Sequence, residues 1–170
     1  MAYLDERELD IHFIESLATV YSTQAGICFV LYGGLVYQER AFSGPRFRFP
    51  YGVDMSAAVF LPQPEHPSDE LIITEGTADA LAAAQEGYRS VAMLGSLVPQ
   101  RRFDLVKSLV RSVRRTIYIP DNDAPGYAAA DRLLRNLGCP VQLGLLPYGV
   151  KDLCELPREK RKAWLRHEVG

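Results

Sequence analysis

The sequence is poor in cysteine, and the little that it has is widely spaced. The three cysteines are Cys28, Cys139 and Cys154, with no CxxC pair among them. This spacing excludes a zinc ribbon or zinc finger, because such sites need paired ligands. An odd, sparse set is also unlike a disulfide scaffold and is typical of a reducing compartment, so we expect a cytoplasmic location.

Long apolar runs and a strong net charge are missing as well. No run approaches the roughly 20 apolar residues that a membrane-spanning helix needs, and the charged start MAYLDERELD is neither a signal peptide nor a membrane anchor. The net charge of the 170 residues is only -2. Any binding of phosphate or nucleic acid must therefore come from local basic residues or from bound metal.

The first part of the chain, residues 1–68, is predicted to form a small mixed α+β subdomain. A helix is expected over about 6–21, followed by short strand-like runs. The runs 26–32 and 34–42 lie on either side of a Gly-Gly pair, which is typical of a β-hairpin. The polar, proline-rich segment 63–70 predicts a linker or surface loop.

In residues 69–156, unlike the first part of the chain, short apolar runs alternate with segments of helical spacing. The runs are LIITE (71–75), SVAML (90–94), TIYIP (116–120) and VQLGLL (141–146). This alternation predicts βαβ units, and hence an α/β fold with a four-stranded parallel sheet flanked by helices. A C-terminal helix is expected within 157–170.

Acidic residues follow two of the predicted parallel strands. Glu75 ends the first run, and Asp121 and Asp123 follow the third, while Asp79 comes one helical turn after Glu75. Taken singly, each acid is compatible with a solvated turn or a helix-stabilising charge. Because the carboxyl ends of parallel strands meet at one edge of a sheet, the acids together are expected to converge.

Converging carboxylates repel one another, by roughly 4 kcal/mol per pair at about 4 Å and an effective dielectric near 20. Such a cluster must take up protons or bind a cation. Oxygen ligands suit Mg²⁺ or Mn²⁺, and Mg²⁺ is usually held by one or two carboxylates together with water and phosphate. The residues therefore predict a metal site suited to phosphoryl or nucleotidyl transfer.

The order of these motifs resembles the Toprim family, which includes bacterial-type primases, topoisomerases and some nucleases. The matching segments are IITEGTADALAAA (72–84), MLGS (93–96), YIPDNDAPGYAAADRL (118–133) and LPYGVKDLCEL (146–156). The glycine and small residues after the Asp-x-Asp pair resemble the primase-type members, the catalytic cores of bacterial and phage DNA primases. The N-terminal subdomain resembles, more weakly, the strand layer that precedes Toprim in primases.

This resemblance implies roles for individual residues. Glu75, Asp121 and Asp123 would be catalytic, and the same three acids with Asp79 would bind Mg²⁺ or Mn²⁺. Lys151 and Asp152 would lie near the phosphates of an incoming nucleotide or of nucleic acid. Many relatives carry an acid where this chain has Cys154, so an acidic contact there is in doubt, and we interpret the thiol as buried.

Basic and aromatic residues alternate in the segment GPRFRFPYG (44–52). On a strand, Arg46 and Arg48 would share one face and Phe47 and Phe49 the other. The arginines are candidate contacts to phosphate or to a template strand. The same alternation is compatible with a half-buried strand that has a solvated face.

The function that these features favour is primer synthesis in DNA replication by a reduced primase-type Toprim core, compatible with a mobile element. Its expected partners are single-stranded nucleic acid, nucleoside triphosphates and a replicative helicase or another replication protein, with no membrane. Two alternatives stay open. One is a small Toprim nuclease that hydrolyses RNA or DNA, because relatives of that kind are often small single-domain proteins of about this length. The other is a non-catalytic primase-like accessory or inhibitory module, because zinc and helicase parts are absent from the sequence and its net charge is small.

Overall fold

The computed structural model describes the chain except residues 1, 18, 33–35, 44–46, 96 and 170. The strands are β1 (Val20–Ser22), β2 (Gly26–Tyr32), β3 (Val36–Ala41), β4 (Phe47–Arg48), β5 (Val59–Phe60), β6 (Glu70–Thr74), β7 (Arg89–Ala92), β8 (Arg115–Ile119) and β9 (Gln142–Leu143). The helices are α1 (Ala2–Asp5), α2 (Ile11–Ser16), α3 (Thr77–Gln85), α4 (Gln100–Val110), α5 (Ala124–Leu137), the short 3-10 helix η1 (Leu153–Glu155) and α6 (Arg158–Val169). The strands form a mixed sheet in the order β4-β3-β2-β5-β7-β6-β8-β9, with β1 paired to β2.

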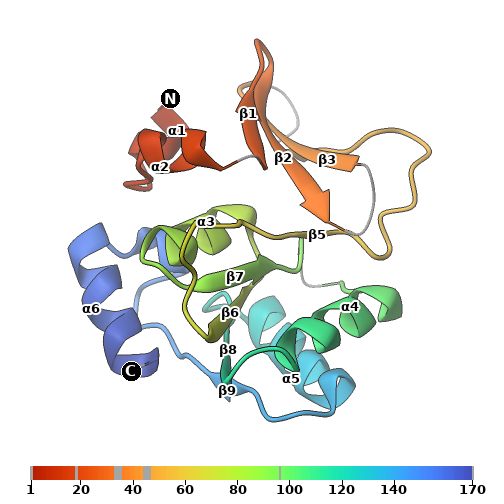
Figure 1. Ribbon diagram of the computed structural model, residues 1–170, viewed down its shortest axis with the longest axis vertical. Coiled ribbons are helices and arrows are strands. Elements are labelled where there is room, and N and C mark those ends of the chain that lie inside the picture. Colours follow the sequence, from red (N-terminus) through yellow and green to blue (C-terminus); the bar gives the residue numbers. More distant parts are fainter. Residues whose placement is uncertain (1, 18, 33–35, 44–46, 96, 170) are drawn as a thin grey trace.

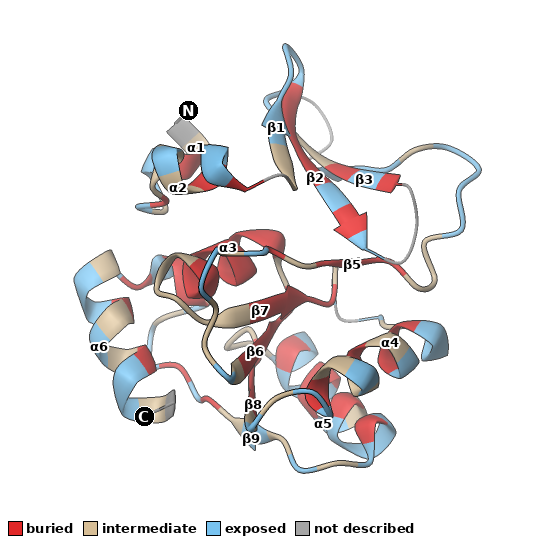
Figure 2. Ribbon diagram, viewed as in Figure 1, coloured by how far each residue is buried: buried red, intermediate tan, exposed pale blue. Residues whose placement is uncertain are grey.

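The four strands β7-β6-β8-β9 are parallel, as the alternating pattern predicts. Their side chains alternate between two apolar layers. Ile72 and Ile117 pack on the side of α3 and α6, whereas Leu71 and Ile73 pack on the side of α4 and α5. Because helices cover both faces, the central strands β6 and β8 are buried except at their first residues (Figures 1 and 2).

The order of the strands creates a switch point at β6. The chain leaves β6 through α3 to reach β7 on one side, and then returns through α4 to β8 on the other side. Right-handed crossovers in opposite directions place α3 and α4 on opposite faces of the sheet. In open α/β sheets, ligands bind outside the carboxyl ends of the strands at such a point, which is the edge where β6 and β8 end.

The prediction of one N-terminal helix over about 6–21 is wrong. The structure has two short helices and then strand β1. Asp10 caps α2 by accepting hydrogen bonds from the backbone N–H groups of His12 and Phe13. Leu17 is already extended, and Val20 pairs with Phe29 of β2, because a β-branched residue gains more from an existing sheet than from another helical turn.

The predicted hairpin is confirmed as β2 and β3, whose connecting residues lie outside the described part of the chain. The N-terminal strands do not form a separate layer. Phe60 of β5 pairs with Leu31 of β2 and with Ala92 of β7, so the antiparallel strands extend the parallel sheet. The domain limits at 68 and 156 stay predictions. No helix within the described residues is both long and apolar enough to cross a membrane.

Candidate active site

Glu75 lies directly after β6, at the switch point. The register sets Thr74 level with Ile119, so the residues that follow β6 and β8 emerge side by side. The Glu75 side chain is 8% exposed, and its Oε1 accepts hydrogen bonds from the backbone N–H of Asp121 at 3.2 Å and from the Tyr118 hydroxyl at 3.3 Å. Burial raises the pKa of Glu75, and these two donors oppose that rise.

Asp121 and Asp123 follow β8 and have different partners. Asp123 caps α5, because its Oδ1 accepts from the backbone N–H of Gly126 at 2.9 Å, and its Oδ2 lies 4.0 Å from Lys151 Nζ. Burial raises the pKa of Asp121 to about 7, and the negative charges of Glu75, Asp152 and Asp123 add to that rise. Three neighbouring acids therefore disfavour the ionised form of Asp121.

Asp79 and Asp152 approach the same point from the α3 side of the sheet. Oδ1 of Asp79 accepts from the backbone N–H of Cys154 at 3.0 Å, and Oδ1 of Asp152 caps η1 through the N–H of Glu155 at 3.0 Å. Burial raises the pKa of Asp79, and the charges of Asp152 and Asp121 raise it further. In the structure the charge of Asp152 acts on Asp79 and Asp121, and its position near a bound phosphate stays a prediction.

The Cys154 thiol is buried, as the sequence predicts. Burial raises the pKa of this thiol well above its ordinary value, so the sulfur stays neutral at physiological pH. Its backbone N–H, rather than its side chain, serves the site by holding Asp79.

Asn122 fixes the position of Lys151. Its side-chain amide donates to the carbonyl of Val150 at 3.0 Å, and its backbone N–H donates to the carbonyl of Lys151 at 2.7 Å. The hydroxyl of Tyr127 in turn donates to the Asn122 side-chain oxygen. The middle residue of the Asp-Asn-Asp motif thus ties the loop before η1 to the start of α5, a role that sequence reasoning missed.

The donor set of the acid cluster fits Mg²⁺. We define the acid cluster as Glu75, Asp79, Asp121, Asp123 and Asp152. Within the described residues no three His, Cys, Asp or Glu side chains are placed to hold a metal ion by themselves. Mg²⁺ needs no such cage, since it takes one or two carboxylates with water and phosphate. Burial and then the charges of neighbouring acids raise the pKa of Asp121, and a bound cation would offset both effects.

In the Arg-Phe segment, the face that carries Phe47 and Phe49 lies towards the acid cluster, and the face that carries Arg48 does not. Phe47 and Phe49 line a pocket of about 270 Å³ together with Glu75 and Asp121. Arg48 lies on the other face of the strand, 3.7 Å from the carboxylate of Glu39. A direct contact from Arg48 to phosphate stays a prediction, and Arg46 lies outside the described residues.

The turn between α1 and α2 supplies a basic residue, Arg7, that the sequence did not indicate. Arg7 lines a second, polar pocket of about 330 Å³ with Lys151, Asp152 and Cys154. Its guanidinium lies 4.2 Å from the centre of the Tyr3 ring. No local pattern marks Arg7, because only contacts between distant segments, such as the hydrogen bond from Arg161 to the carbonyl of Arg7, bring it there.

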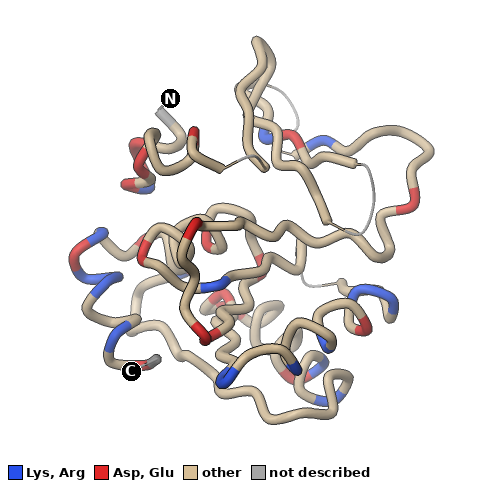
Figure 3. Tube along the Cα trace, viewed as in Figure 1, with Lys and Arg blue, Asp and Glu red and all other residues tan. Residues whose placement is uncertain are grey.

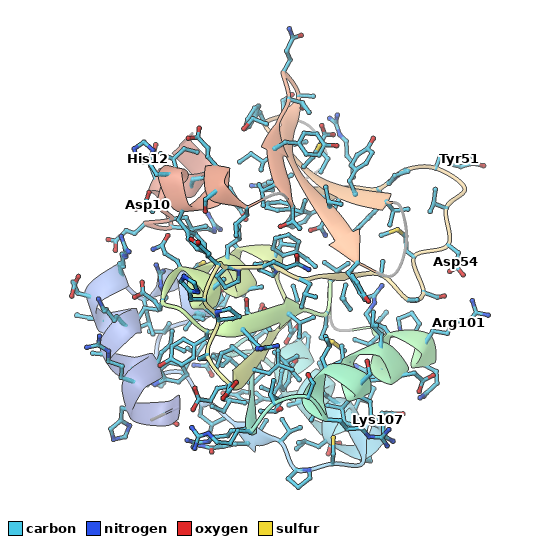
Figure 4. The ribbon with its side chains drawn as sticks, viewed as in Figure 1. Asp10, His12, Tyr51, Asp54, Arg101 and Lys107 are labelled. Atoms are coloured by element: carbon cyan, nitrogen blue, oxygen red, sulfur yellow. The ribbon has the colours of Figure 1, made fainter. Side chains whose placement is uncertain are left out.

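Arg101 and Arg102, in the first turn of α4, make contacts within the protein. Lys and Arg follow α4 and α6 along the outside of the fold (Figure 3). Arg101 pairs with Asp54 at 3.3 Å, so the loop before β5 is tied to α4 (Figure 4). Arg102 is buried and donates to the carbonyls of Met93 and Met55.

The charge of the acid cluster predicts an unusual dependence of stability on pH. Because the folded-state pKa values of Asp121 and Asp79 are raised from 3.8 towards 7, folding takes up protons between these values. Metal-free protein should therefore lose stability as pH rises from about 4 to about 7. Millimolar Mg²⁺ should restore stability at about pH 8 and have little effect at about pH 5.

Thermal unfolding followed by circular dichroism, with EDTA or with Mg²⁺ at each pH, measures this. K⁺ at matched ionic strength is the control for screening. Equal stabilisation by Mg²⁺ at both pH values would contradict the prediction.

Comparison with known proteins agrees with this geometry. A family model described as Toprim-like matches residues 72–156. The fold is similar to that of a DnaG primase catalytic domain bound to ssDNA (TM-score 0.70, 18% identity, 99% of this chain and 69% of that chain). It is also similar to the E. coli primase catalytic core (TM-score 0.67, 16% identity, 98% of this chain and 72% of that chain).

A third similar structure is the primase fragment of the bacteriophage T7 primase-helicase (TM-score 0.68, 17% identity, 89% of this chain and 66% of that chain). The sequence matches none of the curated proteins with which it was compared. The family model spans half of the chain and includes every member of the acid cluster. The chain belongs to the Toprim-like family, and its fold is that of a primase catalytic core.

Proposed function

We propose that this chain catalyses Mg²⁺-dependent nucleotidyl transfer on a single-stranded template, as a primase-type Toprim core. The observation that carries the proposal is the acid cluster itself, in which residues from β6, β8, α3 and η1 meet at the switch point of the sheet. Burial and mutual repulsion of the negative charges destabilise the metal-free acid cluster. A bound cation with phosphate would offset that destabilisation.

The residues of the site have distinct parts in this mechanism. The acid cluster would hold the metal, which when bound neutralises charge on the phosphates and favours attack by a hydroxyl. Both hydrogen bonds to Glu75 within the described residues use Oε1, so Oε2 remains to accept a proton or to bind the metal. Lys151, half-exposed beside Asp123, would bind a phosphate oxygen.

Primer synthesis is favoured over hydrolysis because the N-terminal strands take part in the site. The structural likeness to primase cores extends over 98–99% of the chain, not only over the Toprim part. Two pockets flank the acid cluster, and each combines N-terminal with Toprim residues. A hydrolytic enzyme needs to place one nucleic-acid strand and water, whereas a polymerising enzyme needs to place a strand end and a nucleotide together.

Primer synthesis with labelled ribonucleoside triphosphates on single-stranded DNA tests the proposal. Product is expected only with template, nucleotide and Mg²⁺ or Mn²⁺ all present. Glu75→Gln should lower the rate at least about 100-fold, because it removes the ionisable oxygen while keeping the shape of the side chain. Glu65→Gln, on the exposed loop before β6, is the matched control and should leave the rate unchanged.

The alternatives give different outcomes in the same assay. Cleavage of the template without added nucleotides would replace the primase proposal with a nuclease. Neither synthesis nor cleavage, together with tight binding of a replication protein that survives Glu75→Gln, would replace it with an accessory module. A replicative helicase as partner and a cytoplasmic location remain predictions.

A further inference from the structure

The pocket between the N-terminal strands and the acid cluster has an unusual lining. One wall is aromatic, from Phe47 and from Phe49, which is 44% exposed. The opposite wall is the start of α3 and the turn after β7, where Leu94 and Gly95 both have positive φ. A non-glycine residue in that conformation is strained, and such strain clusters at ligand sites.

Two buried polar groups of this lining lack a protein partner. Gln38 is 5% exposed, and no described residue donates a hydrogen bond to its Oε1. Thr77 is 2% exposed, and its Oγ1 has no partner among the described residues either. Buried polar groups in folded proteins are nearly always hydrogen-bonded, so two exceptions in one pocket need an explanation.

The register of β3 and β4 explains how Gln38 and the phenyl rings reach the same pocket. Arg40 pairs with Phe47 and Glu39 pairs with Arg48. Since alternate residues of a strand share a face, Gln38 lies on the face of Phe47, while Arg48 lies on the other. An amide edge and an aromatic surface are therefore held on one side of a sheet, next to Glu75.

An aromatic wall together with amide and hydroxyl groups is the chemistry that binds a nucleobase. Every base offers a flat face that stacks on an aromatic ring, and an edge whose donors and acceptors match an amide. A purely apolar ligand would leave Gln38 and Thr77 unsatisfied.

We propose that Phe49 and Gln38 bind a nucleobase beside the acid cluster, with Phe49 stacking on its face and Gln38 bonding its edge. The inference rests on the proposed function and assigns the base-binding part of that site. The base can belong to the incoming nucleotide or to the template strand, and the experiment distinguishes the two.

The test measures binding rather than turnover, on the full chain with Mg²⁺. The probes are ATP against inorganic triphosphate, and a short single-stranded oligonucleotide against its abasic counterpart. Phe49→Leu should weaken binding of the base-containing probe about ten-fold, since stacking is the main loss. Binding of inorganic triphosphate and of the abasic strand should not change.

Phe42→Leu is the matched control. It makes the same substitution at an exposed phenylalanine just after β3 that does not line the pocket, so binding of all four probes should match wild type. Gln38→Leu is the second variant. It should weaken base binding while leaving the melting temperature equal or higher, because it removes an unsatisfied buried polar group. If Gln38 had only a structural role, Gln38→Leu would instead lower the melting temperature.

The source of the base follows from which pair of probes responds. If Phe49→Leu weakens the binding of ATP alone, the pocket is assigned to the incoming nucleotide. If it weakens the binding of the oligonucleotide alone, the pocket is assigned to the template. The inference is overturned if Phe49→Leu binds both base-containing probes as wild type does, or loses the base-free probes equally. The proposed function fails differently, through absence of primer synthesis by the wild-type protein.

Discussion

Replacing Asp121 by asparagine is expected to abolish nucleotidyl transfer and, at the same time, to stabilise the metal-free protein. The charges of Glu75, Asp152 and Asp123 all act on Asp121. Asparagine keeps one side-chain oxygen but lacks the negative charge with which Asp121 would bind the proposed metal, which should cost roughly 100- to 1,000-fold in rate. The loss of repulsion should raise the melting temperature by about 2–4 °C, for about 1 kcal/mol in a chain of this size.

Asp131→Asn is the matched control for this prediction. Asp131 lies on the exposed side of α5, where it pairs with Arg135 one turn later. Its replacement should leave the rate unchanged and should not raise the melting temperature, because an exposed pair of this kind contributes little to stability. Primer synthesis and thermal unfolding in EDTA measure both effects. An Asp121→Asn protein that is active, or that melts below wild type, would contradict the assigned role.

The position of the acids could be predicted from the sequence because it depends only on the strand pattern. Once β6 and β8 are neighbouring parallel strands, Glu75 and Asp121 must meet at one edge. Which atoms hold the acids could not be predicted in this way. Tyr118 reaches Glu75 from within β8, and Cys154 reaches Asp79 through its backbone, so neither residue type signals the contact.

The face of the Arg-Phe segment illustrates a second limit. Alternation shows that the arginines and the phenylalanines lie on opposite faces, but not which face meets the acids. That choice depends on the pairing of Glu39 with Arg48, a register that the sequence pattern leaves undetermined. Arg7 and Gln38 were missed for the same reason, since each reaches its pocket through contacts between distant segments.

Gly126→Ala is expected to disable the site although it replaces no acidic residue. A Cβ at this position would lie 2.1 Å from the carbonyl oxygen of Asp121 and 2.9 Å from Oε1 of Glu75. The first neighbour is backbone and cannot rotate away, so α5 or the segment after β8 must shift. Overpacking of this kind typically costs 1–3 kcal/mol, and here it should approach or exceed about 3 kcal/mol.

The same shift should lower the rate of primer synthesis at least about 100-fold, since small displacements of catalytic groups have effects of this size. Gly144→Ala is the control that separates added volume from position. Its Cβ would lie 3.1 Å or more from side chains of Trp164, Ile117 and Ile119, which can yield by a few tenths of an ångström. Gly144→Ala should therefore keep most of the activity, whereas Gly126→Ala should not. Equal effects of the two substitutions on rate and melting temperature would show that the close approach of α5 to Asp121 does not hold the acid cluster in place.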